Sequence, residues 1–175
     1  IRNIAKGLSS NQAKVFYEPN SGRNFKALVE MVKLSNVWKF STDRISMGLA
    51  EEILLQCQDT ALELVIATHG KNGLSYCYKM NSGVFSSWID GPYINFKFVK
   101  DTSGAGDWLT AGFLHYWSLE QFELDNRIIN NVLKKSLKLS EIASMTQGAQ
   151  GVFYDQNLLE RLKKEHGVKI ATPLE

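Results

Sequence analysis

The sequence has 175 residues, of which 44% are hydrophobic and 22% charged, and its net charge is +2. This composition is ordinary for a globular domain with a buried core, and the scattered lysines and arginines argue against nucleic acid or an anionic membrane as partners. No apolar run is long enough for a transmembrane helix and no signal peptide is found, so we expect a cytoplasmic protein.

In the first half of the chain, predicted strands alternate with predicted helices. Apolar residues at helical spacing predict a helix over 24–34, and Asp43 is predicted to cap a second helix through 44–57. The predicted strands cover residues 14–18, 36–40 and 62–69. This alternation predicts parallel βαβ units.

The second half begins with a predicted antiparallel hairpin, in which "LSYCYKM" and "GVFSSWI" flank "NSG". A strand over 94–99 is predicted to lead into a glycine-rich turn, and a last short strand is predicted at "VKIA". Helices are predicted over 105–118, 122–146 (with a break) and 155–165. No linker composition interrupts the chain, so we expect one domain over 1–175 without an internal boundary.

Cys57 and Cys77 are the two cysteines of the sequence. They form no CxxC pair and have no histidine or cysteine at the spacing of metal ligands. We therefore predict that both are free thiols.

The stretch "VKDTSGAGDWLTAGF" places a predicted strand, a glycine-rich turn and a predicted helix in succession. The first amides of a helix lack intrahelical partners and carry partial positive charge. Small residues at Gly104, Ala105 and Gly106 let a phosphate approach these amides closely. The turn does not match a P-loop, since no Lys follows, and Leu109 stands where a Rossmann fingerprint has its third glycine.

Asp107, directly after this turn, is open to two interpretations. A carboxylate beside an anion-binding turn suits phosphoryl transfer, because it can accept the proton of an attacking hydroxyl. Acidic residues are also favoured in the first turn of any helix, where they have no catalytic role. The residues alone do not choose between these interpretations.

Four segments together resemble the ribokinase, or PfkB, family of carbohydrate kinases. "DTSGAGD" (101–107) is similar to the DTxGAGD signature of that family, and "FYEPNSGR" (16–23) to its fDpNxR strand and turn. "IATHGKNG" (66–73) resembles its vTlGxxG nucleotide loop, and "MTQGAQG" (145–151) its late GA element. These segments occur in the family's order along nearly the whole chain.

The resemblance implies an α/β, three-layer α/β/α ribokinase-like fold with a mostly parallel sheet and an antiparallel hairpin. It covers the C-terminal, nucleotide-binding half of such a kinase, so the N-terminal part and the lid are expected to be missing. It also implies phosphorylation of a small-molecule sugar or sugar-like alcohol, with ATP as phosphoryl donor and Mg²⁺. The 175 residues alone are then expected to be inactive, and their exposed sheet edge to favour a homo-oligomer.

The resemblance also assigns roles to individual residues. Asp107 becomes the catalytic base, and Asp101 joins a monovalent-cation site. The anion hole consists of Gly104, Ala105 and Gly106. The nucleotide-binding residues are Thr68, Gly70, Gly73, Gly148 and Ala149.

Two departures from the family pattern support an alternative function. The family's NxxE element, which organises Mg²⁺ and phosphate, aligns with Ser41 and Arg44, and an arginine cannot bind Mg²⁺. Trp108 is bulkier than the residue expected after the catalytic base. The alternative is a catalytically impaired, kinase-like protein that binds nucleotide or sugar phosphate and has a regulatory role.

Overall fold

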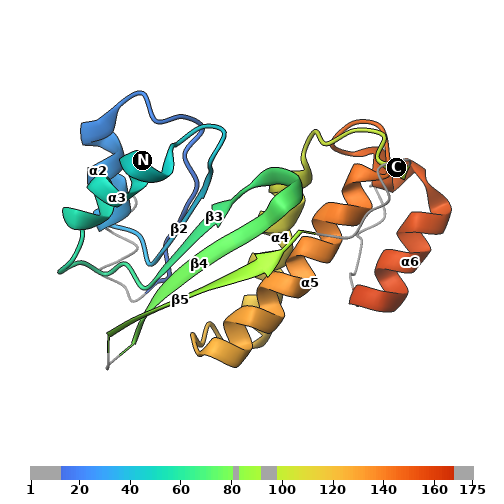
Figure 1. Ribbon diagram of the computed structural model, residues 1–175. Helices are drawn as coiled ribbons and strands as arrows, with labels where there is room; N and C mark the ends of the chain where they lie inside the picture. The colour runs from blue at the N-terminus through green and yellow to red at the C-terminus, as the bar shows by residue number, and fades with distance from the viewer. Residues whose placement is uncertain (1–12, 81–82, 92–97, 168–175) are drawn as a thin grey trace. The chain divides into compact units, whose positions relative to one another are not determined.

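The computed structural model describes residues 13–80, 83–91 and 98–167, and the side chain of His166 is not described. The chain divides into two compact units, residues 1–91 and 92–175, and each is described by itself. Figure 1 shows the sheet of the first unit and the helices of the second.

The described part of the first unit contains a five-stranded sheet in the order β1-β2-β3-β4-β5. The first three strands pair in parallel, and the last three pair antiparallel, so the predicted hairpin is confirmed as β4–β5. The strands are β1 (Phe16–Tyr17), β2 (Val37–Ser41), β3 (Leu64–Thr68), β4 (Gly73–Met80) and β5 (Gly83–Asp90).

Along the chain, helix α2 (Phe25–Lys33) connects β1 to β2, and helix α3 (Met47–Leu55) connects β2 to β3. The Asn24 side chain caps α2 by accepting from the amide of Ala27. The prediction that Asp43 caps the second helix is wrong, because Ser46 is its N-cap. The amides of Arg44 and Ile45 both donate to the Ser41 carbonyl oxygen, so the chain makes a turn here before the helix begins.

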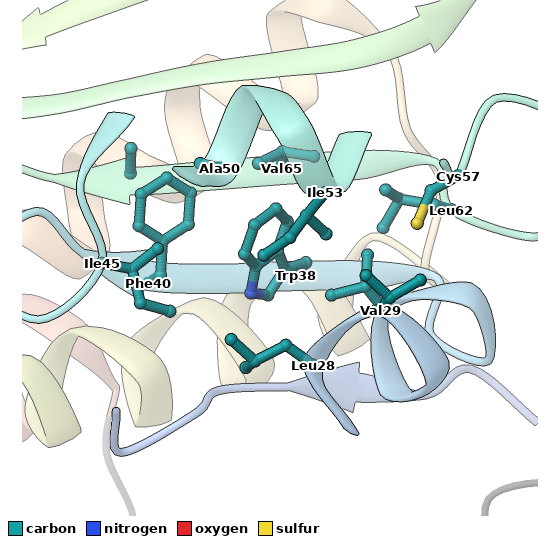
Figure 2. Close-up of a cluster of buried hydrophobic side chains, with 12 residues drawn as sticks. Leu28, Val29, Trp38, Phe40, Ile45, Ala50, Ile53, Cys57, Leu62 and Val65 are labelled. Carbon is teal, nitrogen blue, oxygen red and sulfur yellow. The ribbon is translucent and has the colours of Figure 1, made fainter. Parts of the chain in front are cut away.

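The core of the first unit lies between α2, α3 and one face of the sheet (Figure 2). Side chains on a strand alternate between faces, so Trp38 and Phe40 of β2 lie on the same face, with ring centroids 4.7 Å apart. Each fully buried side chain of this size stabilises the fold by roughly 1.5–3 kcal/mol. The cluster consists of Leu28, Val29, Val32, Trp38, Phe40, Ile45, Ala50, Ile53, Cys57, Leu62, Val65 and Ala67.

Both cysteines are free thiols, as predicted. Cys57 is buried in this core, and Cys77 of β4 packs against it. Burial raises the pKa of both thiols, so both are held in the unreactive protonated form.

Lys39 on β2 is a buried charged residue, with 1% of its surface exposed. Its ammonium group donates to the carboxylate of Glu18, which directly follows β1. Tyr17 pairs with Trp38 across the two parallel strands, so Glu18 and Lys39, which follow them, are also neighbours. This ion pair anchors the start of the "EPNSGR" turn to the sheet.

The second unit is helical in its described part, with α4 (Ala105–Leu119), α5 (Asn126–Ser144) and α6 (Gln156–His166). A short 3-10 helix, η3 (Gly151–Tyr154), precedes α6. The predicted break within 122–146 is wrong, because α5 begins only after the Asp125 cap and is then continuous. The predicted strand over 94–99 lies largely outside the described residues, Phe98 and Val99 are not in a strand, and "VKIA" also lies outside them.

Helices α4 and α5 pack closely side by side (Figure 1). A Cβ atom on Gly112 of α4 would lie 2.8 Å from Cδ1 of Leu139 and 3.1 Å from Cα of Ser136. Phe113 and Trp117 on the same helix are almost fully buried. This packing fixes the middle and the C-terminal half of α4 against α5.

Candidate active site

Gly104 is the N-cap residue of α4 and has a left-handed backbone, with φ of 77°. Residues with a side chain rarely adopt this conformation. A Cβ atom on Gly104 would also lie 2.5 Å from Cβ of Ala149 and 2.9 Å from its Cα. Glycine is therefore required here for two independent reasons, the backbone conformation and the close contact with Ala149.

The first backbone amides of α4 are the groups predicted to bind an anion. The Ala105 amide donates to the Thr102 carbonyl oxygen at 3.1 Å, so it is already used in the turn ahead of the helix. Within the described residues, the amides of Gly104, Gly106 and Asp107 have no hydrogen-bond acceptor. These three amides, at the positive end of the helix dipole, are the ones that can bind an anion.

The Asp107 carboxylate lies in the first turn of α4 and is exposed. In the part of the chain that the structure describes, it has no hydrogen-bond or ion-pair partner. A carboxylate without a partner, next to amides without acceptors, can accept the proton of a hydroxyl that lies beside an anion bound at those amides. This juxtaposition is what the catalytic interpretation of Asp107 requires.

Asp101 joins the turn before α4 to the segment around Gly148. Its Oδ1 accepts from the Ser103 amide at 2.8 Å, and its Oδ2 accepts from the Gly148 amide at 2.9 Å. The hydrogen bonds from Ser103, and then the one from Gly148, lower the pKa of this carboxyl group. Both oxygens thus have a structural partner, and the cation site assigned to Asp101 stays a prediction.

Trp108, one residue after the proposed base, makes a second connection to the same segment. Its indole Nε1 donates to the Ala149 carbonyl oxygen at 2.9 Å. Its ring lies against Phe153, with centroids 5.6 Å apart. The sequence analysis noted the bulk of Trp108 but missed this connection. A partly buried indole N–H needs a hydrogen-bond acceptor, and this need could have indicated it.

The loop that follows β3 contains the other predicted nucleotide-binding residues. The His69 amide donates to the Gly73 carbonyl oxygen, and the Gly73 amide donates to that of Gly70. A Cβ atom on Gly73, where φ is 112°, would lie 2.1 Å from the Ile89 carbonyl oxygen. Glycine at position 73 is therefore explained by its contact with β5.

The Ser41–Arg44 turn, which replaces the NxxE element, lies beside this loop. Ser41 pairs with Thr68 at the ends of β2 and β3, and the Thr68 carbonyl oxygen accepts from both the amide and the Oγ1 of Thr42. Arg44 is exposed, and within the described residues no carboxylate forms an ion pair with it. The described residues also contain no cluster of three His, Cys, Asp or Glu side chains that could hold a metal ion.

Solved structures of kinases are similar to this chain over most of its length. A fructokinase from Vibrio cholerae O395, in a form with bound fructose, ADP and calcium ion, aligns with 91% of the chain at 22% identity and a TM-score of 0.69. A fructokinase from Xylella fastidiosa with bound ATP aligns with 94% of it at 18% identity and a TM-score of 0.68. An adenosine kinase from Schistosoma mansoni, in complex with 2-fluoroadenosine, aligns with 85% of it at 22% identity and a TM-score of 0.65.

The chain has the ribokinase-like fold. At these identities the structural likeness establishes the α/β fold and no more, and it confirms the fold that the sequence motifs predict. The alignments cover 53%, 57% and 46% of the three kinases, so the chain spans about half of their length. No family model matches the sequence, and no curated protein is similar enough to count as a relative.

None of the described helices of this ribokinase-like chain combines the length and the apolar character that crossing a membrane requires.

Proposed function

We propose that the chain is the nucleotide-binding, catalytic part of an ATP-dependent kinase that phosphorylates a sugar or sugar-like alcohol. One observation carries the proposal. Among the residues that the structure describes, the amides of Gly104, Gly106 and Asp107 find no acceptor, and the exposed Asp107 carboxylate lies on the same helical turn. The resemblance of "DTSGAGD" to the signature of carbohydrate kinases, together with the fold, supports the same function.

Phosphoryl transfer needs few protein groups, and these residues supply two of them. The amides at the start of α4 stabilise negative charge on the transferred γ-phosphoryl group. The acceptor hydroxyl oxygen forms a bond to the γ-phosphorus, the bond from that phosphorus to the β-γ bridging oxygen breaks, and ADP leaves. The Asp107 carboxylate accepts the proton that the hydroxyl loses.

Two sets of residues are proposed nucleotide contacts, one from each unit of the chain. Ala149 lies against Gly104 and is tied to Trp108, so the segment of Gly148 and Ala149 is suited to border a nucleotide whose phosphates bind at α4. Thr68, Gly70 and Gly73 are proposed nucleotide contacts on the strength of the sequence resemblance.

The residues at the NxxE position do not fit a protein-held Mg²⁺. Arg44 carries positive charge, and Ser41 Oγ accepts from the Asp43 amide. Mg²⁺ is commonly bound through substrate phosphates and water, so it would enter with ATP as part of the substrate.

The test of this proposal is Asp107→Asn in the full-length protein. The substitution keeps the shape of the side chain and removes its charge and basicity. We expect kcat to fall by about 10²- to 10⁴-fold, which is the usual effect of removing a general base. The nucleotide Kd should hold or decrease, because a carboxylate no longer repels the γ-phosphate.

Asp125→Asn is the matched control, since Asp125 is the acidic N-cap of α5 in the same unit. Asparagine caps helices about as well as aspartate, so this variant should keep both stability and kcat. A near-normal kcat for Asp107→Asn would show that Asp107 is only an acid at a helix terminus.

Arg44 and Ser41 favour a second candidate, a kinase-like protein that binds nucleotide or sugar phosphate without transferring phosphate. An exposed arginine that has no ion-pair partner in the described part of the chain, at the place of a metal-organising acid, suits phosphate binding by a charge-assisted hydrogen bond. Binding of ADP does not separate the candidates. Sugar-dependent conversion of ATP to ADP by the full-length protein supports the kinase, and binding without turnover over a panel of sugars supports the regulatory protein.

A further inference from the structure

The segment of Gly148 and Ala149 is held at both ends by residues that flank the start of α4. Asp101 accepts a hydrogen bond from the Gly148 amide at 2.9 Å, and the Trp108 indole donates one to the Ala149 carbonyl oxygen at 2.9 Å. The two bonds cross sequence separations of 47 and 41 residues. They therefore fix a distant segment to the turn that carries the proposed anion site.

Ala149 itself is in close contact with the N-cap of α4. A Cβ atom on Gly104 would be only 2.5 Å from the Ala149 Cβ, so the two residues leave no room for a side chain between them. Ala149 therefore borders the start of α4 on the side of this segment. The Trp108 indole restrains Ala149 directly, through the carbonyl group of that residue.

Phe153 contacts the face of the Trp108 indole. The centroids of the Phe153 and Trp108 rings are 5.6 Å apart at an interplanar angle of 37°, and Phe153 belongs to η3, which begins two residues after Ala149. Gly151, the first residue of η3, would place a Cβ atom 2.6 Å from the Oγ1 of Thr146. The turn between α5 and η3 is thus tightly closed, and Trp108 contacts this region at Ala149 and Phe153.

We propose that Trp108 is a positioning residue that sets the affinity for nucleotide through Ala149. The inference rests on the proposed function, because it places the phosphates at the α4 amides and the rest of the nucleotide along the 148–149 segment. Trp108 is not a catalytic residue in this scheme. It holds the segment for the nucleoside, while the α4 amides bind the phosphates whether or not a nucleoside is attached.

Trp117 on the same helix offers a matched control. Its indole Nε1 also donates to a backbone carbonyl, that of Glu123, at 3.0 Å, and its ring also packs on a phenylalanine, Phe113. Trp117 lies near the other end of α4. A Trp→Phe change at either position removes one indole hydrogen bond and keeps an aromatic ring.

The experiment measures binding of ADP and of inorganic tripolyphosphate to the full-length protein by titration calorimetry, for wild type, Trp108→Phe and Trp117→Phe. Loss of one hydrogen bond that restrains the segment should weaken ADP binding by about three- to tenfold in Trp108→Phe. Tripolyphosphate affinity should change by less than about twofold, because its partners are the α4 amides. KM for ATP should rise with the ADP Kd, and kcat should stay within about twofold.

Trp117→Phe should leave both affinities unchanged and lower only the thermal stability. Phe153→Leu is a second variant for the case that Trp108→Phe does not fold. It keeps the indole N–H but removes the ring beside it, and should weaken ADP binding in the same direction by a smaller factor.

The outcomes separate this inference from the proposed function. If wild type binds neither ADP nor tripolyphosphate, both are wrong. If wild type binds ADP and Trp108→Phe binds it equally well, only the role of Trp108 is wrong. An equal loss of ADP and tripolyphosphate affinity, or the same loss in Trp117→Phe, would also overturn it, because the tryptophan would then only stabilise the fold.

Discussion

The loop at Thr68–Gly73 and the turn at Gly104–Asp107 each follow the pattern of a glycine-rich nucleotide motif, yet their backbone groups are used differently. In the first loop, the amides of His69 and Gly73 both bond within the loop, and the Gly91 amide donates to the Asn72 carbonyl oxygen. In the second, the amides of Gly104, Gly106 and Asp107 lack acceptors within the described residues.

The glycines of the two regions also serve different purposes. A Cβ atom on Gly73 would collide with the backbone of β5, and one on Gly91 would lie 2.0 Å from the Lys71 carbonyl oxygen. These glycines let the loop and the hairpin pack together. Gly104 lets the N-cap of α4 take a left-handed backbone conformation in close contact with Ala149. Gly106 lies exposed in the first turn of the helix. Gly73 and Gly91 thus have a packing role, whereas the turn before α4 leaves three amides without acceptors within the described residues.

The largest expected effect tests the packing role of the first loop. Gly73→Ala would place a methyl group 2.1 Å from the Ile89 carbonyl oxygen, in a backbone conformation with φ of 112°. Backbone atoms cannot move aside as a side chain can, so the free energy of unfolding should fall by at least about 3 kcal/mol. Urea unfolding measures this loss.

Gly70→Ala is the matched control in the same loop, because an added Cβ there meets nothing within 4 Å and only its φ of 56° is unfavourable. It should cost about 1–2 kcal/mol. Equal losses for the two variants would contradict a specific contact between Gly73 and β5.

The second effect, on ligand affinity, tests the binding role of the turn before α4. Gly106→Val adds a branched side chain beside the unpaired amides, so it should hinder approach of a phosphate and weaken ADP binding by about 10- to 100-fold, or roughly 1.4–2.7 kcal/mol. Helix stability should hardly change, because valine is no worse than glycine in a helix. Calorimetry with ADP and urea unfolding give the two values.

Gly48→Val makes a close control, since Gly48 is the second residue of α3 as Gly106 is of α4, and is also exposed. It should leave ADP affinity unchanged. A similar loss of affinity at both positions would mean that the α4 terminus is not the phosphate site.

Much of the first unit could be predicted from sequence because its signals are local. The apolar run that contains Leu64 and Ile66 predicts a buried strand, and the spacing of Leu28, Val29 and Val32 predicts a helix with one buried face. The helix cap after β2 could not be predicted, because Asp43 and Ser46 are both good caps. Complete burial of Ile45 ahead of the helix decides between them, and burial is a tertiary property.

The candidate site was predicted only as a set of residues. Sequence identifies Gly104 and Asp107 but cannot show that the Ala105 amide is used within the turn, or that Asp101 and Trp108 are joined to a segment more than 40 residues away. Such contacts depend on how α5 returns the chain to the start of α4. They are visible only in three dimensions.

A smaller effect tests whether Asp101 holds this segment as an ion. Asp101→Asn leaves one oxygen to accept from two amides, so one bond, to Ser103 or to Gly148, is lost. Because folding lowers the pKa of this carboxyl group, its stabilising contribution is present above the ordinary aspartate pKa of about 3.9 and is lost as the pH falls through the folded-state value. The stability difference between wild type and Asp101→Asn should therefore be largest near neutral pH and shrink below about pH 4.

Urea unfolding at neutral and acidic pH measures this difference. Asp59→Asn, in the exposed turn after α3, is the control and should differ little from wild type at either pH. A constant difference for Asp101→Asn across this range would show that the shape of the side chain, and not its charge, holds the segment.

The smallest effect concerns a left-handed position that lacks a glycine. Gln121, in the turn after α4, has φ of 53°, a conformation that costs a residue with a side chain about 1–2 kcal/mol. Gln121→Gly removes this strain but adds about 0.5–1 kcal/mol of backbone entropy to the unfolded chain, so a net gain of roughly 0.5–1 kcal/mol in unfolding free energy is expected. Glu120→Gly, one residue earlier with φ of −91°, carries only the entropic cost and should destabilise by about that amount.

The difference between the two glycine variants, measured by thermal and urea unfolding, isolates the left-handed strain. If it is near zero, the turn before α5 is not strained, and left-handed geometry alone would not explain the glycine at position 104 either, which leaves the contact with Ala149 as its reason.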